Sequence, residues 1–159
     1  MVAGGIIEVD GHVLLVENLR RNGQTDWSTP GGVVEVGEDP VFGLTREVIE
    51  ETGLEVTAWS AALYRVTTIA PDMGWHLDVV VHRALAWTGE LTIGNDPDGI
   101  VIAAQFCDPE TTAKFLAGTA AWVHEPMLGW LDQRWDSPPD FRYRLDGADR
   151  ATATVSRLS

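Results

Sequence analysis

Apolar residues near the N-terminus fall into two short runs that are divided by a turn. Ala3 to Val9 and His12 to Glu17 are rich in β-branched side chains, and Asp10-Gly11 separates them. An Asp-Gly pair between such runs is typical of a tight hairpin turn, so we expect two antiparallel strands. The next stretch, Leu19 to Thr29, is polar and contains glycine, which predicts a loop.

The next apolar pattern has the period of a helix. Val41, Leu44 and Val48 recur at intervals of three and four residues, which places them on one helical face that would pack against a core. The dipeptide Asp39-Pro40 provides a favourable N-cap followed by a residue suited to the first helical position. Gly53 suits the left-handed position that ends a helix. The pattern therefore predicts a helix with defined ends.

The rest of the chain alternates between strand-like and helix-like patterns. Segments rich in valine, threonine and aromatic residues predict strands, whereas proline near the start of an apolar-periodic segment predicts a helix. The expected strands are Leu54 to Ile69 (one long strand or two), Trp75 to Trp87 and Ile100 to Cys107, with loops at Ala70 to Gly74 and Gly94 to Gly99; the expected helices are Pro109 to Ala117, capped by Asp108, and Glu125 to Trp135, with Pro126 at its first position.

Strands on both sides of the first predicted helix, followed by further helices, predict an α/β (α+β) fold with a mixed sheet between helices. A chain of 159 residues can bury a substantial core within one domain. We assign residues 1–136 to this domain.

Residues 137–159 form a C-terminal arm in which Phe141, Tyr143 and Leu145 alternate with polar residues. We expect these three side chains to anchor the arm on an acidic surface, either that of its own domain or that of a second subunit in a homodimer. The alternative is a disordered end. Five of the eleven basic residues lie in the last part of the chain: Arg134, Arg142, Arg144, Arg150 and Arg157.

The formal net charge of −13 argues against binding to nucleic acid or to an anionic membrane. It permits a small phosphorylated ligand, because a divalent cation can bridge acidic groups and phosphate. Cys107 is the only cysteine, which excludes an intramolecular disulfide. The sequence shows neither a signal-peptide pattern nor an apolar stretch of membrane-spanning length, so we expect a soluble cytoplasmic protein.

Three glutamates occupy a second face of the first predicted helix. Glu47, Glu50 and Glu51 have the spacing that brings side chains on a helix within about 5–6 Å of one another. At an effective dielectric near 20, two unit charges 4 Å apart repel by about 4 kcal/mol. Such a cluster is stable when it is exposed, protonated or neutralised, and its oxygen ligands suit Mg²⁺ or Mn²⁺. A solvated acidic helix face is the alternative.

The segment from Gly32 to Leu54 resembles the Nudix box of the Nudix hydrolase family. That motif is glycine, five residues, glutamate, seven residues, arginine-glutamate-apolar, one residue, glutamate-glutamate, one residue and glycine-apolar. It is matched at Gly32, Glu38, Arg46, Glu47, Val48, Glu50, Glu51, Gly53 and Leu54.

The resemblance implies an α/β/α sandwich with the box at the edge of a substrate cleft. It also implies metal-dependent hydrolysis of a pyrophosphate bond in a nucleoside diphosphate-linked molecule, such as a nucleoside triphosphate, nucleotide sugar, ADP-ribose or dinucleotide. A non-catalytic module of the same fold that binds or senses nucleotides is the alternative.

The resemblance assigns roles to individual residues of the box. Glu47, Glu50 and Glu51 resemble the family's ligands for Mg²⁺ or Mn²⁺, and the carbonyl of Gly32 resembles a further ligand. Arg46 resembles the arginine that orients the glutamates, because its planar fork suits a carboxylate. Glu38 resembles the partner of that arginine.

Several Nudix enzymes carry another glutamate near the strand that corresponds to Ile100–Cys107, and this sequence has none there. Asp96 and Asp98, in the preceding loop, are the nearest acids and are either turn residues or participants in the chemistry. Glu47 is therefore the preferred candidate for the base.

Aromatic and basic residues near the expected cleft are candidates for substrate contacts. A tryptophan there can stack on a nucleobase, which contributes about 1–3 kcal/mol. Trp27 and Trp75 are the leading candidates for this role, and Arg20, next to Arg21, for binding a terminal phosphate. The alternatives are ordinary packing for the tryptophans and a solvated loop for the arginines.

Overall fold

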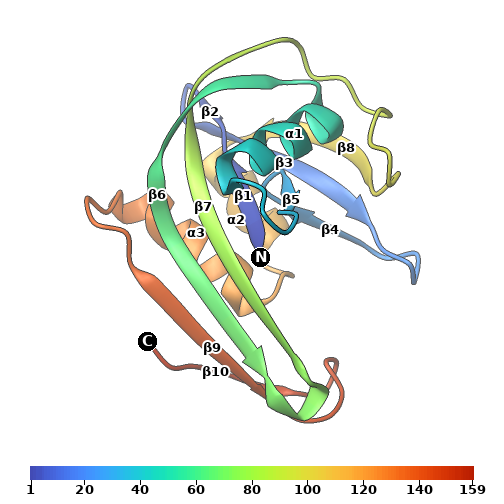
Figure 1. The fold of residues 1–159 in the computed structure, drawn as a ribbon, viewed down its shortest axis with the longest axis vertical. Coiled ribbons are helices and arrows are strands. Elements are labelled where there is room, and N and C mark those ends of the chain that lie inside the picture. The colour runs from blue at the N-terminus through green and yellow to red at the C-terminus, as the bar shows by residue number, and fades with distance from the viewer.

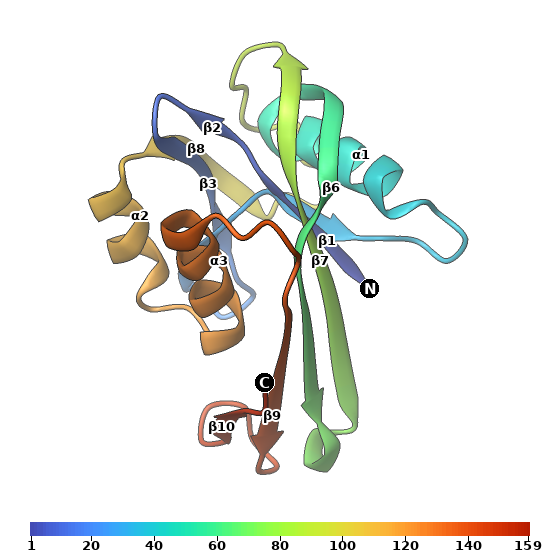
Figure 2. The same ribbon diagram turned by 90° about the vertical axis from the view of Figure 1, so that its left-hand side faces the viewer.

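Two β-sheets lie between helices in the computed structural model, which describes residues 1–159 (Figures 1 and 2). The larger sheet has the strand order β10-β9-β6-β7-β1-β5, and in the smaller sheet β3 pairs with β2, β4 and β8. The strands are β1 (Val2–Ile6), β2 (Glu8–Val9), β3 (His12–Leu19), β4 (Thr25–Ser28), β5 (Gly31–Val33), β6 (Glu55–Ala70), β7 (Trp75–Thr88), β8 (Val101–Cys107), β9 (Asp140–Asp146) and β10 (Thr154–Arg157); the helices are α1 (Pro40–Thr52), the short 3-10 helix η1 (Pro71–Met73), α2 (Pro109–Leu116) and α3 (Ala121–Gln133).

The helices cover the sheets from opposite sides, with α1 on one side and α2 and α3 on the other (Figure 2). Each side has its own apolar core. Leu44 and Val48 of α1 are fully buried in the first core, and Trp122, Met127 and Trp130 of α3 are buried in the second. Since β1 pairs in parallel with β7 while β6 and β7 are antiparallel, the expected mixed sheet within an α/β fold is confirmed.

The ends of α1 follow from the residues that its sequence places there. The Asp39 carboxylate accepts hydrogen bonds from two N–H groups of the first turn, Pro40 occupies the start, and Gly53 ends the helix with φ of 75°. A left-handed φ of this kind favours glycine because it has no Cβ. The predicted boundaries of this helix are therefore confirmed.

The N-terminal hairpin is also confirmed, although its first strand is divided between the two sheets. β1 belongs to the larger sheet, whereas β2 pairs with β3 in the smaller one. Asp10 and Gly11 form the turn with φ of 49° and 78°. Two successive positive φ values are the signature of the hairpin turns that match strand twist, and Asp-Gly readily adopts them.

Two sequence-based boundaries were wrong. The stretch from Leu19 to Thr29 is not only a loop, because β4 lies within it and pairs with the end of β3. Its residues are mostly polar since they lie on a half-exposed surface. Helix α3 begins at Ala121 instead of Glu125, which puts Pro126 inside the helix. The N-cap residue of α3, Ala120, has no side chain that caps the helix, so the sequence contains no local signal for this start.

The C-terminal arm lies along the free edge of β6 (Figure 1). β9 pairs in parallel with β6, and β10 then pairs antiparallel with β9. Phe141, Tyr143 and Leu145 all point into the core beneath α3 and are at most 5% exposed.

The homodimer stays a prediction. No helix of the chain combines the length and apolar composition that a membrane crossing requires.

Candidate active site

Strand β5 and helix α1 approach each other closely at two glycines of the strand. Gly31 has φ of 149°, and a Cβ there would overlap the carbonyl of Ala3 in β1. Its N–H donates a hydrogen bond to Oε2 of Glu51 at 2.9 Å. A Cβ on Gly32 would overlap the carboxyl group of Glu47. Glycine is therefore needed at both positions, at Gly31 for the close approach of β1 and at Gly32 for that of the Glu47 carboxyl group.

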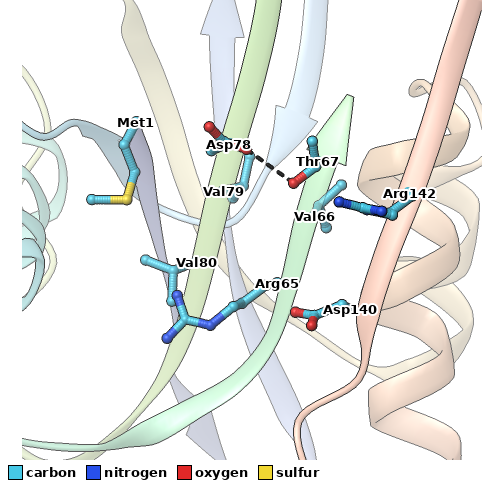
Figure 3. A pocket seen from close by; sticks show the side chains of 9 residues that line it. All are labelled: Met1, Arg65, Val66, Thr67, Asp78, Val79, Val80, Asp140 and Arg142. Carbon is cyan, nitrogen blue, oxygen red and sulfur yellow. Dashed lines mark hydrogen bonds between the residues drawn. The ribbon is translucent and has the colours of Figure 1, made fainter. Parts of the chain in front are cut away.

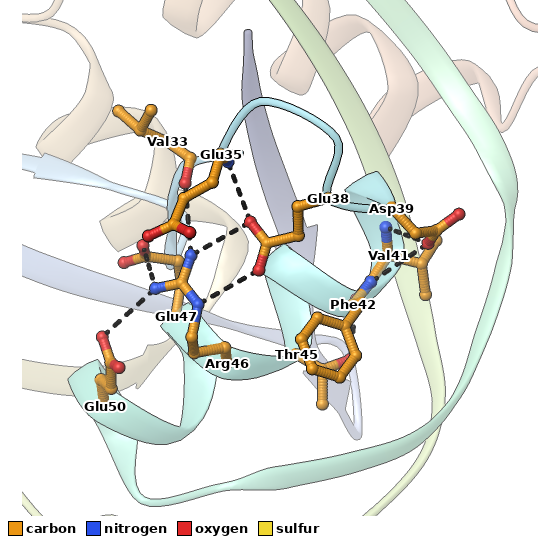
Figure 4. Close-up of polar contacts among 10 residues, drawn as sticks. All are labelled: Val33, Glu35, Glu38, Asp39, Val41, Phe42, Thr45, Arg46, Glu47 and Glu50. Carbon is orange, nitrogen blue, oxygen red and sulfur yellow. Dashed lines mark hydrogen bonds and ion pairs between the residues drawn. The ribbon is translucent and has the colours of Figure 1, made fainter.

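Arg46 holds the acidic side chains on this face of α1 (Figure 4). Its Nη1 donates to Oε1 of Glu47 at 2.8 Å and lies 3.7 Å from Oε2 of Glu50. Its Nε and Nη2 donate to the two carboxylate oxygens of Glu38, each at 3.3 Å. These bonds lower the pKa of Glu38, and the N–H of Glu35 adds to the effect. The fork fixes the loop that precedes α1 against the helix.

Two of the glutamates on this face of α1, Glu47 and Glu51, lie in surroundings that disfavour their ionised form. The pKa of Glu51 is raised to about 8, chiefly by burial; the hydrogen bond from Gly31 lowers it, and the charges of Glu47, Asp96 and Glu50 add to the rise. Burial also raises the pKa of Glu47, although the hydrogen bond from Arg46 opposes this. A buried carboxyl resists ionisation unless a positive charge compensates it. The site therefore favours a cation next to Glu51.

The acidic loop before β8 lies close to this cluster, as the effects of its charges on the two glutamates show. Asp96 uses its carboxylate within the loop, where Oδ2 accepts from the N–H groups of Ile100 at 2.8 Å and Val101 at 3.0 Å. Asp98 is exposed, and its charge raises the pKa of Glu47. Asp96 thus has the turn role, while the side chain of Asp98 is free to face the cluster.

An apolar pocket of about 210 Å³ lies beside Gly31 of β5, on the side of the sheet covered by α3. Gly31 belongs to its lining, together with Ser28, Thr29, Tyr64 and Trp122. No charged side chain lines it. Gly31 therefore connects the pocket to the acidic cluster, because the same residue contacts Glu51 through its N–H.

Two other hollows have a different character. The groove lined by Arg20, Arg21 and Asp98 has a volume of about 610 Å³ and lies at the edge of the acidic loop. A hollow of about 630 Å³ lies on the open face of β6, β7 and β9 (Figure 3). It is lined by Met1 and by residues of these strands, among them Arg65 and Arg142, and includes none of the glutamates. Neither hollow is lined by Glu47, Glu50 or Glu51.

The three expected substrate contacts have protein partners in this structure. Arg20 forms a two-pronged ion pair with Asp26, with both distances 2.7 Å. Trp27 stacks on Phe115 with ring centroids 4.4 Å apart. Trp75 begins β7 and packs against the core beneath α3. Their roles in binding substrate stay predictions.

Comparison with known proteins decides the family. Residues 1–131 match the family model described as the NUDIX domain. The chain belongs to the Nudix family. The resemblance found in the sequence is thereby confirmed. The expectation of a Nudix-type hydrolase is also confirmed at the level of the enzyme family.

Individual Nudix relatives are similar over different shares of their length. A MutT-like protein of Streptomyces ambofaciens is 46% identical over 55 residues, which are 35% of this chain and only about a third (34%) of that protein. An ADP-ribose pyrophosphatase of Methanocaldococcus jannaschii is 30% identical over 78% of this chain and 68% of its own length. A CTP pyrophosphohydrolase of Escherichia coli is 31% identical over 54% of this chain and 73% of its own length.

Solved structures agree on the Nudix fold. The solution structure of the Escherichia coli ORF135 protein superposes with a TM-score of 0.68, covering 86% of this chain and 93% of that one at 23% identity. The agreement concerns the arrangement of strands and helices, and it confirms the α/β/α sandwich.

Nudix hydrolases generally use divalent metal ions, and the donors of this site fit such an ion. No group of three or more histidine, cysteine, aspartate or glutamate side chains stands in a ready metal-binding arrangement, because Arg46 engages Glu47 and approaches Glu50. The available donors are all carboxylate or carbonyl oxygens, which hard divalent cations prefer. The raised pKa of Glu51 indicates that ionisation of this carboxyl is unfavourable, and a cation beside it would supply the compensating positive charge.

Sequence reasoning missed the residues of the apolar pocket. Ser28, Tyr64 and Trp122 come from three distant parts of the chain, and no local motif links them. The density of aromatic residues was the only available signal, and it indicated Trp27 and Trp75 instead.

Proposed function

We propose that this Nudix protein hydrolyses a pyrophosphate bond in a small nucleoside diphosphate-linked molecule, using Mg²⁺ or Mn²⁺. The observation that carries the proposal is the position of Gly31 between the acidic cluster and the uncharged pocket. A nucleotide has the same two parts, a charged pyrophosphate joined to a neutral base. The names of the Methanocaldococcus and Escherichia relatives, an ADP-ribose pyrophosphatase and a CTP pyrophosphohydrolase, support this substrate class.

Glu47, Glu50, Glu51 and the carbonyl of Gly32 are the residues that would hold the cation. When bound, a divalent cation neutralises charge on the phosphoryl oxygens and lowers the pKa of water. The protein then has little covalent chemistry to perform, so its contribution is positioning and charge compensation. Arg46 contributes to positioning, since it fixes Glu38 and Glu47 relative to each other.

Glu47 is the proposed base that removes a proton from the attacking water. The pKa of Glu47 is raised towards neutral pH, and a general base is most effective when its pKa lies near the working pH. Arg46 orients it through the 2.8 Å bond, and Gly32 leaves its carboxyl accessible from the loop. Asp98 is the second acid that can act here, because it is exposed and its charge raises the pKa of Glu47.

The apolar pocket is the proposed site of the nucleobase. Its aromatic walls, Tyr64 and Trp122, can contact a planar base, and the Ser28 and Thr29 hydroxyls can hydrogen-bond its edge. The absence of charged lining residues favours a neutral ring over an anionic group.

A hydrolysis panel tests the proposal. Purified protein is incubated with nucleoside triphosphates, ADP-ribose, a nucleotide sugar and a dinucleotide, with Mg²⁺, with Mn²⁺ or with EDTA, and products are identified by mass spectrometry. We expect cation-dependent release of a nucleoside monophosphate from at least one compound, and loss of that activity in Glu51→Gln. The control is Glu110→Gln, the same change on an exposed residue of α2. Nucleotide binding without any product would instead indicate a sensing module.

A further inference from the structure

The N-terminal half of α3 forms one wall of the apolar pocket, through Trp122, Val123 and Met127. This half of the helix is weakly stabilised by its own sequence. Ala120 stands at the N-cap without a side-chain hydrogen bond, and Pro126 lies inside the helix. Because proline has no N–H, the carbonyl of Trp122 lacks its usual partner four residues later. The wall therefore depends on contacts from outside the helix.

The C-terminal arm supplies such contacts from both of its strands. The hydroxyl of Tyr143 in β9 donates to Oε2 of Glu125 in α3 at 2.8 Å. Arg157 in β10 places Nη1 3.8 Å from the same oxygen, and its guanidinium lies 4.7 Å from the ring centroid of Phe141. Glu125 is thus the point where two strands of the arm meet the helix.

A further contact lies on Trp122 itself. The guanidinium of Arg150, in the connection between β9 and β10, lies over the Trp122 ring at 5.6 Å from its centroid. Arg150 has no ion-pair partner elsewhere in the chain, and an arginine over an aromatic face is an attractive contact. Trp122 therefore has the pocket as one neighbour and the arm as another.

We propose that the C-terminal arm positions the α3 wall of the pocket and thereby sets the affinity for the base of the substrate. This inference rests on the proposed function, since it takes the pocket to be the nucleobase site. Tyr143, Glu125 and Arg157 are positioning residues, because none of them lines the pocket. The arm lies beyond residues 1–131, the segment that matches the family model.

The arm makes no hydrogen bond or ion pair to Glu47, Glu50 or Glu51, whose partners are Arg46 and Gly31. Loosening α3 should therefore weaken binding of the base and leave the chemical step largely intact. That combination raises KM at constant kcat, which is the signature of a uniform binding interaction. A merely destabilised protein would instead lose active molecules, which lowers apparent kcat without changing KM.

The experiment compares Tyr143→Phe and Glu125→Ala, each of which removes the 2.8 Å bond, with Asp146→Asn. Asp146 pairs with Arg144 inside the arm and makes no hydrogen bond or ion pair with α3, so its variant is the control. For the best substrate of the panel, we expect KM to rise by about three- to tenfold in the first two variants, with kcat within about twofold. The double variant should be no worse than Glu125→Ala alone, because that change already removes the bond from Tyr143 together with the contact to Arg157.

Amide hydrogen exchange provides a readout that does not depend on activity. We expect residues 121–125 to exchange faster in Tyr143→Phe than in Asp146→Asn, because the first turns of α3 open more often. Unchanged KM and unchanged exchange in Tyr143→Phe would overturn the positioning role while leaving the proposed function intact. A native protein that neither hydrolyses nor binds any nucleotide would overturn the proposed function, and exchange would still report whether the arm holds α3.

Discussion

Replacing Glu51 with glutamine should change the free energy of unfolding and the turnover in opposite directions, because burial disfavours the charged carboxylate and catalysis requires it. The Glu51 carboxyl has a pKa of about 8 in the metal-free protein, against an ordinary value of 4.5, chiefly because it is buried. The folded state therefore holds a proton that the unfolded state releases as pH rises through 4.5. Since the folded state then binds more protons, the free energy of unfolding falls with rising pH until about pH 8.

The magnitude follows from the two pKa values. Each unit of pKa difference corresponds to 1.36 kcal/mol, so the native protein should lose about 3 kcal/mol between pH 5 and pH 7.5 through this group. Glutamine cannot ionise, and its amide oxygen can still accept the hydrogen bond from Gly31. The variant should therefore keep the stability that the native protein loses over this range.

Urea unfolding in EDTA at the two pH values measures this difference, with Glu110→Gln as the control. We expect Glu51→Gln to be more stable than the native protein at pH 7.5 and similar to it at pH 5. Adding Mg²⁺ should stabilise the native protein more than the variant, because a ligand that binds only the folded state raises stability. Turnover should fall by about two orders of magnitude or more. A variant that is less stable than the native protein at pH 7.5 would refute the reasoning about burial.

Other changes test single contacts. Asp39→Ala removes the N-cap of α1 and should cost about 1 kcal/mol in urea unfolding, whereas Asp39→Asn should stay near native; equal losses in both would contradict the capping role. Leu44→Ala should cost about 2–5 kcal/mol, because the side chain is fully buried, and an unchanged unfolding midpoint would show that the core beneath α1 is misplaced. Gly32→Ala places a methyl group on the Glu47 carboxyl and should lower turnover by about tenfold or more, and native turnover would show that this close approach is unimportant.

Local chemistry made α1 and its loop predictable. Asp39, Pro40 and Gly53 each act within one turn of the helix, and the glutamate spacing fixes one face without reference to the rest of the fold. The Asp10-Gly11 turn is equally local, since its backbone conformation selects its residues. These features lie within short windows of sequence, so the sequence alone specifies them.

Tertiary contacts decided what the sequence did not reveal. The start of α3 has no capping signal, and the helix begins there because Trp122 packs against the sheet. β4 is polar and short, and only its pairing with β3 makes it a strand. The apolar pocket joins Ser28, Tyr64 and Trp122 across three elements, a juxtaposition that only the folded chain creates.

The most direct test of the central claim is identification of the products that the native protein forms from the nucleotide panel with and without a divalent cation. We predict that a nucleoside monophosphate appears only when Mg²⁺ or Mn²⁺ is present, because the cluster of Glu47, Glu50 and Glu51 needs a cation to bind pyrophosphate. Cleavage that proceeds equally well in EDTA, or a complete absence of cleavage across the panel, would contradict the assignment.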